Sequence, residues 1–549
     1  MRAPASGSAA HTRTGRRIRT TRNACPQRTE RRAETADDRS RPRARPPKPL
    51  TGVQAMMTHR TGSATDLAQQ MPGNTSETLT NQDLLPTTPA QRHWNWKDFA
   101  ALWVGMVVCV PTYTMASSML DQGFSWQMAV WLVFLANCIV LVPMVLIGRV
   151  GPRYGVPFPV LARASFGVKG ANLPAVLRGL VACGWFSINC YFGALALHGF
   201  LNVLGLGLAG PAQGQTISSS QFFCFLAFWA VHIWFIWKGL ESIRKLEVIA
   251  APLMIAASIL LVLVLLQRVP SGQLLNLPAK VVEGGPRTWA ALTGLVGFWA
   301  TLALNIPDFT RFAKSQRDQF LGQAIGLPLP MALFSMVGVI GFSASAILYG
   351  KAQLFPDGLL SQMGSLASGL GLLVILLANL TTNVAANLVA PSYDFSQCAP
   401  ARISFRTGGL IAAGIGLLFM PWKLLATSGS YLFTWLGGYG TLLGAIAGIL
   451  LVDYYLVRHG RLVVDDLYRR GGEYEYRNGW NPQALIAFLL GVLPCLPGYL
   501  AVSGVVDMAG MPAFWLTLFD SGWFFSLAVA GGYYYLSAKK KRPPSDPRP

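Results

Sequence analysis

Five polar side chains stand inside one long apolar run, and they are the first residues in the chain that could do chemistry. The segment 371–390 begins with eight apolar or glycine residues. It then places uncharged amides and hydroxyls within a few turns, at Asn379, Thr381, Thr382, Asn383 and Asn387. A run of about 20 apolar residues can cross a bilayer as a helix, and polar groups inside it are costly unless they face protein or water. The segment therefore predicts a binding site, and the alternative is that these side chains join helices in the membrane.

Three apolar segments carry aromatic and amide side chains suited to a flat, neutral ring. The candidates are Trp185, Asn189, Phe298, Trp299, Thr301 and Asn387. Trp185 and Asn189 are four residues apart, so a helix places them on one face. Indole faces suit flat rings, and amides both donate and accept hydrogen bonds. Because none of the set is charged, it favours a neutral heteroaromatic ring or cyclic urea over an amino acid. For Trp185 alone, the alternative is ordinary helix packing.

A cation site is expected beside these residues. Sodium is a hard cation and should prefer oxygen ligands, which the hydroxyls of Thr381 and Thr382 provide. Pro111 interrupts the first apolar span. The break, near Gly105 and Val108, frees backbone carbonyls that an intact helix would use. The alternative for the two threonines is hydrogen bonding to their own helix.

Residue patterns typical of enzymes are missing from the sequence. Six of the eight cysteines fall in apolar spans and none forms a Cys-x-x-Cys pair, so they are interpreted as small core residues. Of the six histidines, only His198 and His232 lie in or beside spans, without a Glu on the same helix that would indicate a metal. Asp308 and Asp394 are expected at cytoplasmic helix ends, either solvated or paired with Arg311 and Arg402. We therefore expect a protein that is not an enzyme and has no organic cofactor.

Composition predicts an all-α polytopic membrane protein. The chain has 549 residues, of which 52% are hydrophobic and only 13% charged, whereas soluble domains carry about 25% charged residues. The alternating pattern of a barrel is missing, so the spans should be helices. Twelve are predicted: 96–119, 126–148, 173–201, 222–237, 248–266, 289–304, 321–348, 371–390, 408–425, 431–456, 484–505 and 514–536.

The spans suggest a duplicated unit. Pro111 interrupts the first span and Pro307 closes the sixth, 196 residues apart, and Asn189 and Asn387 lie in the third and eighth spans, 198 apart. A nearly constant offset indicates two copies of a five-helix unit. Because five is an odd number, the two copies must have opposite orientations in the membrane. Inverted repeats with broken first helices place a substrate between the copies, near the membrane midplane. We expect a transporter domain at 91–540, with repeats at about 96–267 and 287–457 and two extra helices at about 484–537.

The terminal regions are expected to lie in the cytoplasm. Residues 1–50 hold 14 Lys or Arg and four Asp or Glu and lack an apolar run, so 1–90 is predicted to be a disordered basic tail. Residues 1–56 are interpreted as a start codon assigned too early, and nucleic-acid binding is not expected. Every second loop between the predicted spans is poor in basic residues. These loops together hold only Arg268, Lys280, Arg287, Lys351 and Lys423. This bias predicts that the opposite loops, both termini and the short tail 541–549 lie on the cytoplasmic side of a cell (inner) membrane.

Several motifs together resemble the first nucleobase–cation symporter family. They are NQDLLP at 81–86, WVGM at 103–106, PFPVLARASFG at 157–167, NIPDFTR at 305–311 and TNVAAN at 382–387. The resemblance covers about residues 80–540 and is strongest to the uracil, allantoin and hydantoin branch. It implies a five-plus-five inverted repeat of leucine-transporter type with two further helices.

The resemblance also implies roles for individual residues. Trp185 and Trp299 would stack on the two faces of the substrate ring, and Asn387 would hydrogen-bond its amide edge. Asn189 and Cys109 stand where the hydantoin carrier has glutamine, and Phe298 replaces a small residue. The implied sodium positions are Gly105, Val108, Ala378, Thr381 and Thr382, although some relatives use protons.

The sequence is thus interpreted as a cation-coupled importer, acting as a monomer in the lipid bilayer, of a neutral ring of the uracil, allantoin or hydantoin class. One alternative is a permease for a vitamin or nucleoside-like substrate such as thiamine, against which the missing carboxylate counts. Another is a membrane ligand sensor that no longer transports. Which ring is carried, and whether Na⁺ or H⁺ drives it, stays open.

Overall fold

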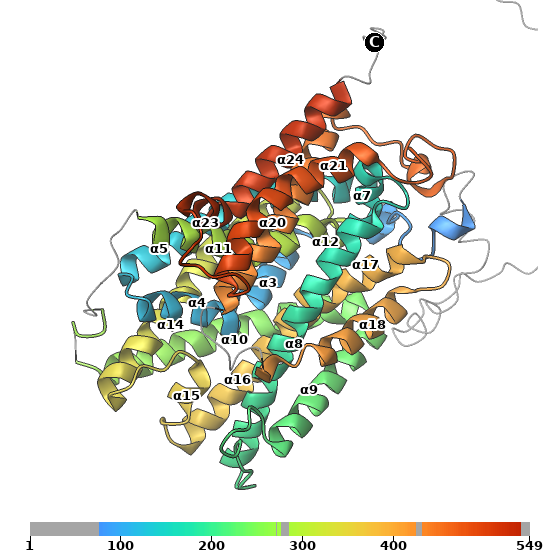
Figure 1. Cartoon of the computed structure of the whole chain (residues 1–549). Helices are drawn as coiled ribbons and strands as arrows, with labels where there is room; N and C mark the ends of the chain where they lie inside the picture. The colour runs from blue at the N-terminus through green and yellow to red at the C-terminus, as the bar shows by residue number, and fades with distance from the viewer. Residues whose placement is uncertain (1–75, 271, 276–284, 424–430, 540–549) are drawn as a thin grey trace, which may run out of the picture. The chain divides into compact units, whose positions relative to one another are not determined.

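A computed structural model describes residues 76–270, 272–275, 285–423 and 431–539. In these ranges the chain is helical and has no β-strand beyond two isolated bridges. Long helices pack side by side, and α8 runs along α16 and α17 although the sequence separates them widely (Figure 1).

The helices of the first half of the chain are α3 (Trp96–Val107), α4 (Val110–Asp121), α5 (Trp126–Gly148), α6 (Val150–Tyr154), α7 (Phe158–Phe166), α8 (Asn172–Val203), α9 (Ser219–Lys238) and α10 (Leu240–Arg268). Those of the second half are α11 (Pro286–Asn305), α12 (Pro307–Thr310), α13 (Gln316–Gly326), α14 (Pro328–Tyr349), α15 (Pro356–Leu360), α16 (Ser365–Val384), α17 (Ala390–Cys398), α18 (Phe405–Leu418) and α20 (Tyr431–Leu451). The C-terminal helices are α21 (Pro482–Val492), α22 (Leu496–Val502), α23 (Ala513–Asp520) and α24 (Gly522–Lys539). Short 3₁₀ or π segments are η1 (Glu77–Leu79), η2 (Pro89–Gln91), η3 (Ala385–Val389), η4 (Val452–Val457), η5 (Asp465–Tyr468) and η6 (Leu493–Cys495).

The number of spans agrees with the prediction. Ten helices among the described residues are long and apolar enough to cross a membrane, and two bent pairs raise the number to 12. One pair is the expected broken first span, α3 and α4, bent by 55°. The other, α23 and α24, is bent by 81°, whereas the sequence predicts a single span at 514–536 without a break.

The first break follows from Pro111. Cys109 is extended, and α4 begins with Pro111 in its first turn, where a missing N–H does no harm. The amide of Cys109 bonds to the carbonyl of Val107 rather than to that of Gly105. The carbonyls of Gly105 and Met106 are therefore free for side chains of another helix.

The second polar region coincides with a π-helical turn. Pro391 lies in the first turn of α17 and lacks the N–H that would bond to the carbonyl of Asn387. The preceding turn, η3, widens to π geometry, which occurs often at functional sites. Asn387 thus lies on an irregular part of the span.

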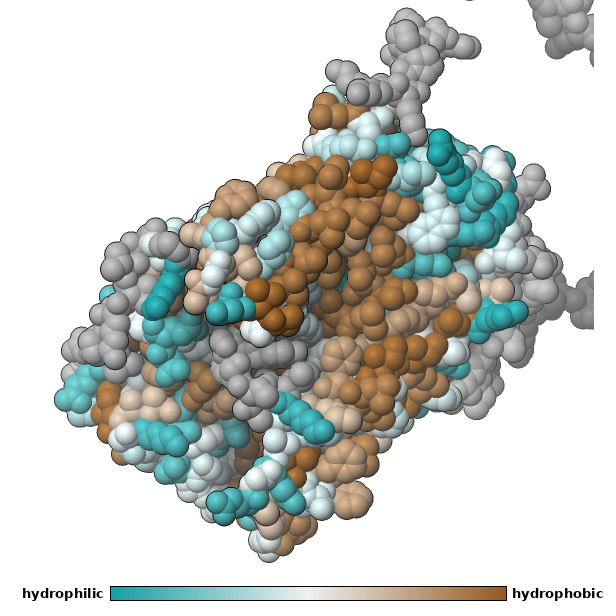
Figure 2. Space-filling model, in the orientation of Figure 1, coloured by the Kyte–Doolittle hydropathy of each residue, from teal (hydrophilic) through white to brown (hydrophobic). Residues whose placement is uncertain are grey.

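Apolar side chains cover the outside of the helices. Leu253, Ile259 and Leu263 on α10 are all more than half exposed, as expected for contact with lipid acyl chains. In Figure 2, hydrophobic residues dominate the middle of the visible face, over α21 and α24 of Figure 1. The fold therefore presents a surface suited to a bilayer.

Part of the predicted tail is packed. Leu84 and Leu85 are buried, and the amide of Asn81 donates to Ser396 Oγ at 2.8 Å and to the carbonyls of Pro400 and Ile403 at 3.0 Å. The ordered chain thus begins before the expected boundary at residue 90. Residues 1–75 and 540–549, on which the rest of the tail predictions fall, lie outside the described residues.

Candidate functional site

The broken first helix and α16 meet through the two predicted threonines. Thr381 Oγ1 lies 3.0 Å from the carbonyls of both Gly105 and Ala378. Thr382 Oγ1 lies 3.2 Å from the carbonyl of Gly105 and 3.1 Å from that of Met106. The hydroxyls therefore bridge to the carbonyls that the break has freed, in addition to the bond of Thr381 to its own helix.

The remaining predicted cation residues lie beside them. Val108 and Ala378 form a small buried cluster with Ala250 and Met254 of α10. The structure thus brings all five residues, Gly105, Val108, Ala378, Thr381 and Thr382, to one place where α3, α10 and α16 meet.

A buried carboxylate lies against Gly105 of this group, and sequence reasoning missed it. Glu247 on α10 is only 1% exposed, and among the described residues neither of its oxygens has a hydrogen-bond partner. Its Oε2 lies against Gly105, so closely that a Cβ added to this glycine would be 1.6 Å away. Burying an unpaired carboxylate is costly unless a cation lies nearby. Two hydroxyls, neighbouring carbonyls and one carboxylate form a donor set that fits a hard monovalent cation such as sodium.

The predicted ring-binding residues line a single cavity. All seven of them border it: Cys109, Trp185, Asn189, Phe298, Trp299, Thr301 and Asn387. Thr382 also lines it, so the cavity adjoins the five predicted cation-binding residues. Its volume is about 20 Å³, enough for about one water molecule. Side chains must therefore move before a ring can enter.

Three aromatic side chains that line this cavity contact one another. Phe298 lies edge-on to both indoles, with ring centroids 5.2 Å from Trp185 and 4.8 Å from Trp299. Trp185 is held by a hydrogen bond from its Nε1 to Tyr439 Oη of α20, at 3.1 Å. Sequence reasoning missed Tyr439, because spacing along the chain does not tell which helix faces Trp185.

The two amides leave their oxygens available. Asn189 Nδ2 donates to the carbonyl of Trp185 at 3.0 Å, and Asn387 Nδ2 donates to Asn383 Oδ1 at 3.0 Å. Asn189 Oδ1 is buried without a partner among the described residues, as is Trp299 Nε1. The walls therefore offer both hydrogen-bond acceptors and a donor to a bound molecule.

The expectation that the two aspartates are solvated is wrong, although Asp308 does interact electrostatically with the expected Arg311. Asp308 and Asp394 are fully buried rather than solvated. Asp308 Oδ1 accepts a hydrogen bond from the amide of Phe158 at 2.8 Å, and Asp394 lies 4.0 Å from Arg178 Nε rather than beside Arg402. Arg178 also donates to the carbonyl of Ala386, at 3.0 Å, in the π turn. These charges thus form a buried group on one side of the ring cavity.

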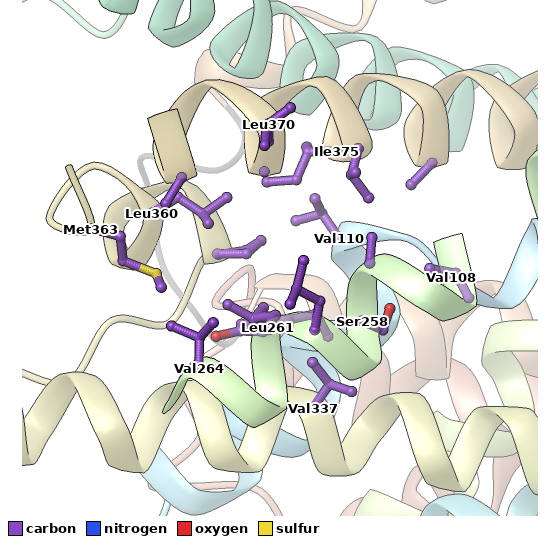
Figure 3. Close-up of a pocket in the computed structure, with 18 of the residues that line it drawn as sticks. Val108, Val110, Ser258, Leu261, Val264, Val337, Leu360, Met363, Leu370 and Ile375 are labelled. Atoms are coloured by element: carbon purple, nitrogen blue, oxygen red, sulfur yellow. The ribbon is translucent and has the colours of Figure 1, made fainter. Parts of the chain in front are cut away.

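A larger cavity of about 300 Å³ lies between α4, α10, α14 and α16. Its walls are mostly aliphatic, and Ser258 is the polar side chain labelled among them (Figure 3). Val108 and Ala378, two of the predicted cation-binding residues, also line this larger cavity. An apolar lining cannot satisfy the polar edge of a nucleobase, so this cavity is a poor candidate for the ring site.

Residues 86–525 match the family model described as "Permease for cytosine/purines, uracil, thiamine, allantoin". The chain is 43% identical over 463 residues to a purine-uracil permease of Arabidopsis thaliana, covering 82% of this chain and 76% of that protein. It is 34% identical to an allantoin permease of Bacillus subtilis, covering 83% and 92%.

The fold resembles a solved transporter of the nucleobase-cation-symport-1 family, Mhp1, in a closed conformation with bromovinylhydantoin bound. The TM-score is 0.69 at 25% identity, covering 84% of this chain and 96% of the other. This likeness confirms the inverted-repeat fold of leucine-transporter type, and the relatives are transporters rather than enzymes. The chain therefore belongs to the family of permeases for cytosine, purines, uracil, thiamine and allantoin, and it is an integral multi-pass membrane protein.

Proposed function

We propose that this permease imports a neutral nucleobase or related cyclic ureide by cation-coupled alternating access. The observation that carries the proposal is the single uncharged cavity lined by all seven ring-binding candidates. Trp185 and Trp299 would flank the ring, after Phe298 has moved. Asn189 and Asn387 would bond to its edge, with Thr301 and Cys109 closing the cavity. The relatives named for uracil, purines and allantoin support this substrate class.

The proposed coupling ion is sodium, with the proton as the alternative. The carbonyls of Gly105, Val108 and Ala378 and the hydroxyls of Thr381 and Thr382 would hold it, and the carboxylate of Glu247 would balance its charge. Such an ion would join the broken α3 to α16, and so favour one arrangement of the two repeats over another. The excess of basic residues in alternate loops supports an orientation with both termini in the cytoplasm.

The test is uptake of labelled uracil, allantoin and hydantoin into proteoliposomes, under an inward sodium gradient and, separately, under a pH gradient. We expect accumulation of at least one ring that stops when the driving gradient is collapsed. Correctly inserted protein that accumulates none of the three rings would refute the proposal.

Asn387→Ala tests the site itself. Removing one partner of a buried hydrogen bond costs about 1–3 kcal/mol, which is about a 5- to 150-fold loss of ring affinity. Asn379→Ala is the matched control, because Asn379 is buried on the same helix and bonds to the carbonyl of Ile375 away from the cavity. Equal ring affinity in the two variants would contradict the role of Asn387.

A further inference from the structure

The larger cavity, of about 300 Å³, follows one face of α16. Its lining residues on that helix recur at helical spacing, from Leu366 through Leu370 to Ala378, and the two ends of this stripe are about 18 Å apart along the helix axis. Leu261 of α10 and Ile375 of α16 lie on different sides of the space (Figure 3). The cavity is therefore elongated, and its volume is twice that of an engineered cavity of about 150 Å³ that binds benzene.

The walls of this cavity leave a bound molecule with only apolar contacts. Among the described residues, no charged side chain lines it. Ser258 Oγ donates to a backbone carbonyl of its own helix at 2.8 Å, and Cys109 Sγ lies 3.3 Å from Thr112 Oγ1. Tyr113 Oη lies against Gly341 of α14, which does not line the cavity. Because apolar cavities stay dry and cannot satisfy polar groups, the occupant that fits this one is a hydrocarbon.

The cavity opens on the apolar outer surface of the fold. Leu260 of α10 and Leu366 and Leu370 of α16 line it and are more than half exposed. Farther in, Leu360 and Ile375 line it and are buried. In a multi-pass membrane protein, the hydrocarbon that meets such a surface is the acyl-chain core of the bilayer. A chain end can therefore enter between α10 and α16 without leaving the membrane.

The inner end of the cavity is formed by two of the predicted cation-binding residues. Val108 and Ala378 line it and belong to a buried cluster with Ala250 and Met254. The carbonyl of Ala378 lies 3.0 Å from Thr381 Oγ1. An empty space gives the side chains at its edge no dispersion contacts on that side. A chain end placed there would pack against Val108 and Ala378 and restrict the backbone that carries their carbonyls.

We propose that this cavity binds the end of one acyl chain of a membrane lipid, and that the chain supports the cation site from behind. The second part rests on the proposed function, because it takes Val108 and Ala378 as sodium ligands. A straight chain suits an elongated cavity, and its polar headgroup stays outside, in the interfacial region of the bilayer. The lipid thus acts as a structural ligand of the permease.

The first experiment uses the full-length protein in vesicles of palmitoyl-oleoyl phosphatidylcholine. The vesicles contain a small share of the same lipid with a diazirine at the end of one chain, and mass spectrometry after photolysis locates the attached lipid. Attachment is expected at the buried Leu360 and Ile375, as well as at Leu253 on the exposed face of α10. Attachment confined to exposed residues would overturn the inference. Labelling of the buried residues by a diazirine sterol but not by the chain would overturn it in favour of a sterol site.

Filling the cavity tests whether the chain occupies it. Ala367 lines the cavity, so the ring of Ala367→Phe should exclude the chain and abolish attachment at Leu360 and Ile375. Leu373→Phe is the matched control, because Leu373 is exposed on the same helix and does not line the cavity. It should keep the wild-type labelling. Ala257→Phe fills the cavity from α10 if the first variant does not fold. Labelling of the buried residues that persists in a folded, filled variant would overturn the inference.

The last experiment tests the support of the cation site. Binding of radioactive sodium is compared in vesicles of palmitoyl-oleoyl and of diphytanoyl phosphatidylcholine, whose methyl branches widen every chain. The wild type and Leu373→Phe should bind sodium more weakly in the branched lipid. Ala367→Phe should lose this difference, because its own side chain fills the cavity.

Equal sodium affinity of the wild type in the two lipids would overturn the supporting role of the chain. A difference that Ala367→Phe retains would also overturn it, since the effect would then arise elsewhere in the bilayer. Sodium binding in neither lipid would instead refute the proposed coupling ion, while the labelling still decides whether the chain is bound.

Discussion

Replacing Glu247 by glutamine tests whether its carboxylate serves the cation. The change keeps size and one oxygen but removes the charge from a side chain that is 1% exposed and presses against Gly105. Breaking a buried charge pair costs about 3–5 kcal/mol. The amide oxygen of glutamine can still act as a ligand. We therefore expect a cost at the lower end of this range, about 3 kcal/mol, which is roughly a 100-fold loss of sodium affinity.

The assay follows thermal unfolding of the detergent-purified protein as sodium chloride replaces choline chloride. A ligand that binds the folded state stabilises it in proportion to RT ln(1 + [L]/Kd), so the sodium concentration needed for a given shift in Tm reports affinity without any transport step. Without sodium, Glu247→Gln should unfold at the same temperature as the wild type or higher, because it no longer buries an unpaired carboxyl group. Direct binding of radioactive sodium gives a second, independent measure.

Glu241→Gln is the matched control on the same helix. Glu241 is about half exposed and pairs with Arg244 at 2.7 Å, so its loss should leave the sodium response unchanged. A sodium-dependent shift as large in Glu247→Gln as in the wild type would refute the assignment of Glu247. A wild-type protein that shows no sodium response at all, while a pH gradient drives uptake, would refute sodium coupling itself.

Two further substitutions test the packing around the site. In Gly105→Ala the new Cβ would overlap the buried carboxylate at 1.6 Å, so we expect about 1–3 kcal/mol of destabilisation and loss of the sodium response, measured by thermal unfolding against Gly414→Ala, where a Cβ meets open space. Tyr439→Phe strands the Nε1–H of Trp185 and should weaken ring binding about 5-fold or more in calorimetry. Tyr454→Phe, which removes a buried hydroxyl that does not line the cavity, should bind as the wild type does. Equal ring binding by the two tyrosine variants would contradict the role of Tyr439.

Local signals in the sequence were sufficient for much of the fold and for the residues that line the candidate cavity. Unbroken apolar runs revealed the spans, since a helix in lipid must satisfy its backbone internally. Pro111 revealed the first break, because proline acts within one turn of its own position. Uncharged polar residues inside apolar runs revealed the cavity residues, since such groups are costly elsewhere in a membrane. Each of these effects depends on residues that are near one another in the chain.

The missed features depend on which helix faces which. Glu247 lies one residue before the predicted span 248–266, where a charge is readily interpreted as a solvated end. Its burial follows from the stripe of Glu247, Ala250 and Met254 that packs against α3 and α16, whereas the opposite face of α10 is exposed. No proline lies at the bend between α23 and α24, so the sequence did not indicate it. The contact of Tyr439 with Trp185 can be recognised only when α20 is placed beside α8.

Thr382 connects the two halves of the proposed mechanism. Its side chain lines the ring cavity, and its hydroxyl bonds to the carbonyls of Gly105 and Met106 on the broken helix. A cation that drew this hydroxyl away from those carbonyls would change the wall that the ring meets, and a ring that moved the wall would change the cation's ligands. Linkage then requires the two effects to be equal, so that sodium raises ring affinity by the same factor by which the ring raises sodium affinity. In the proposed mechanism, coupling would therefore reduce to the differential contacts of one threonine with two ligands, without a pathway of residues between distant sites.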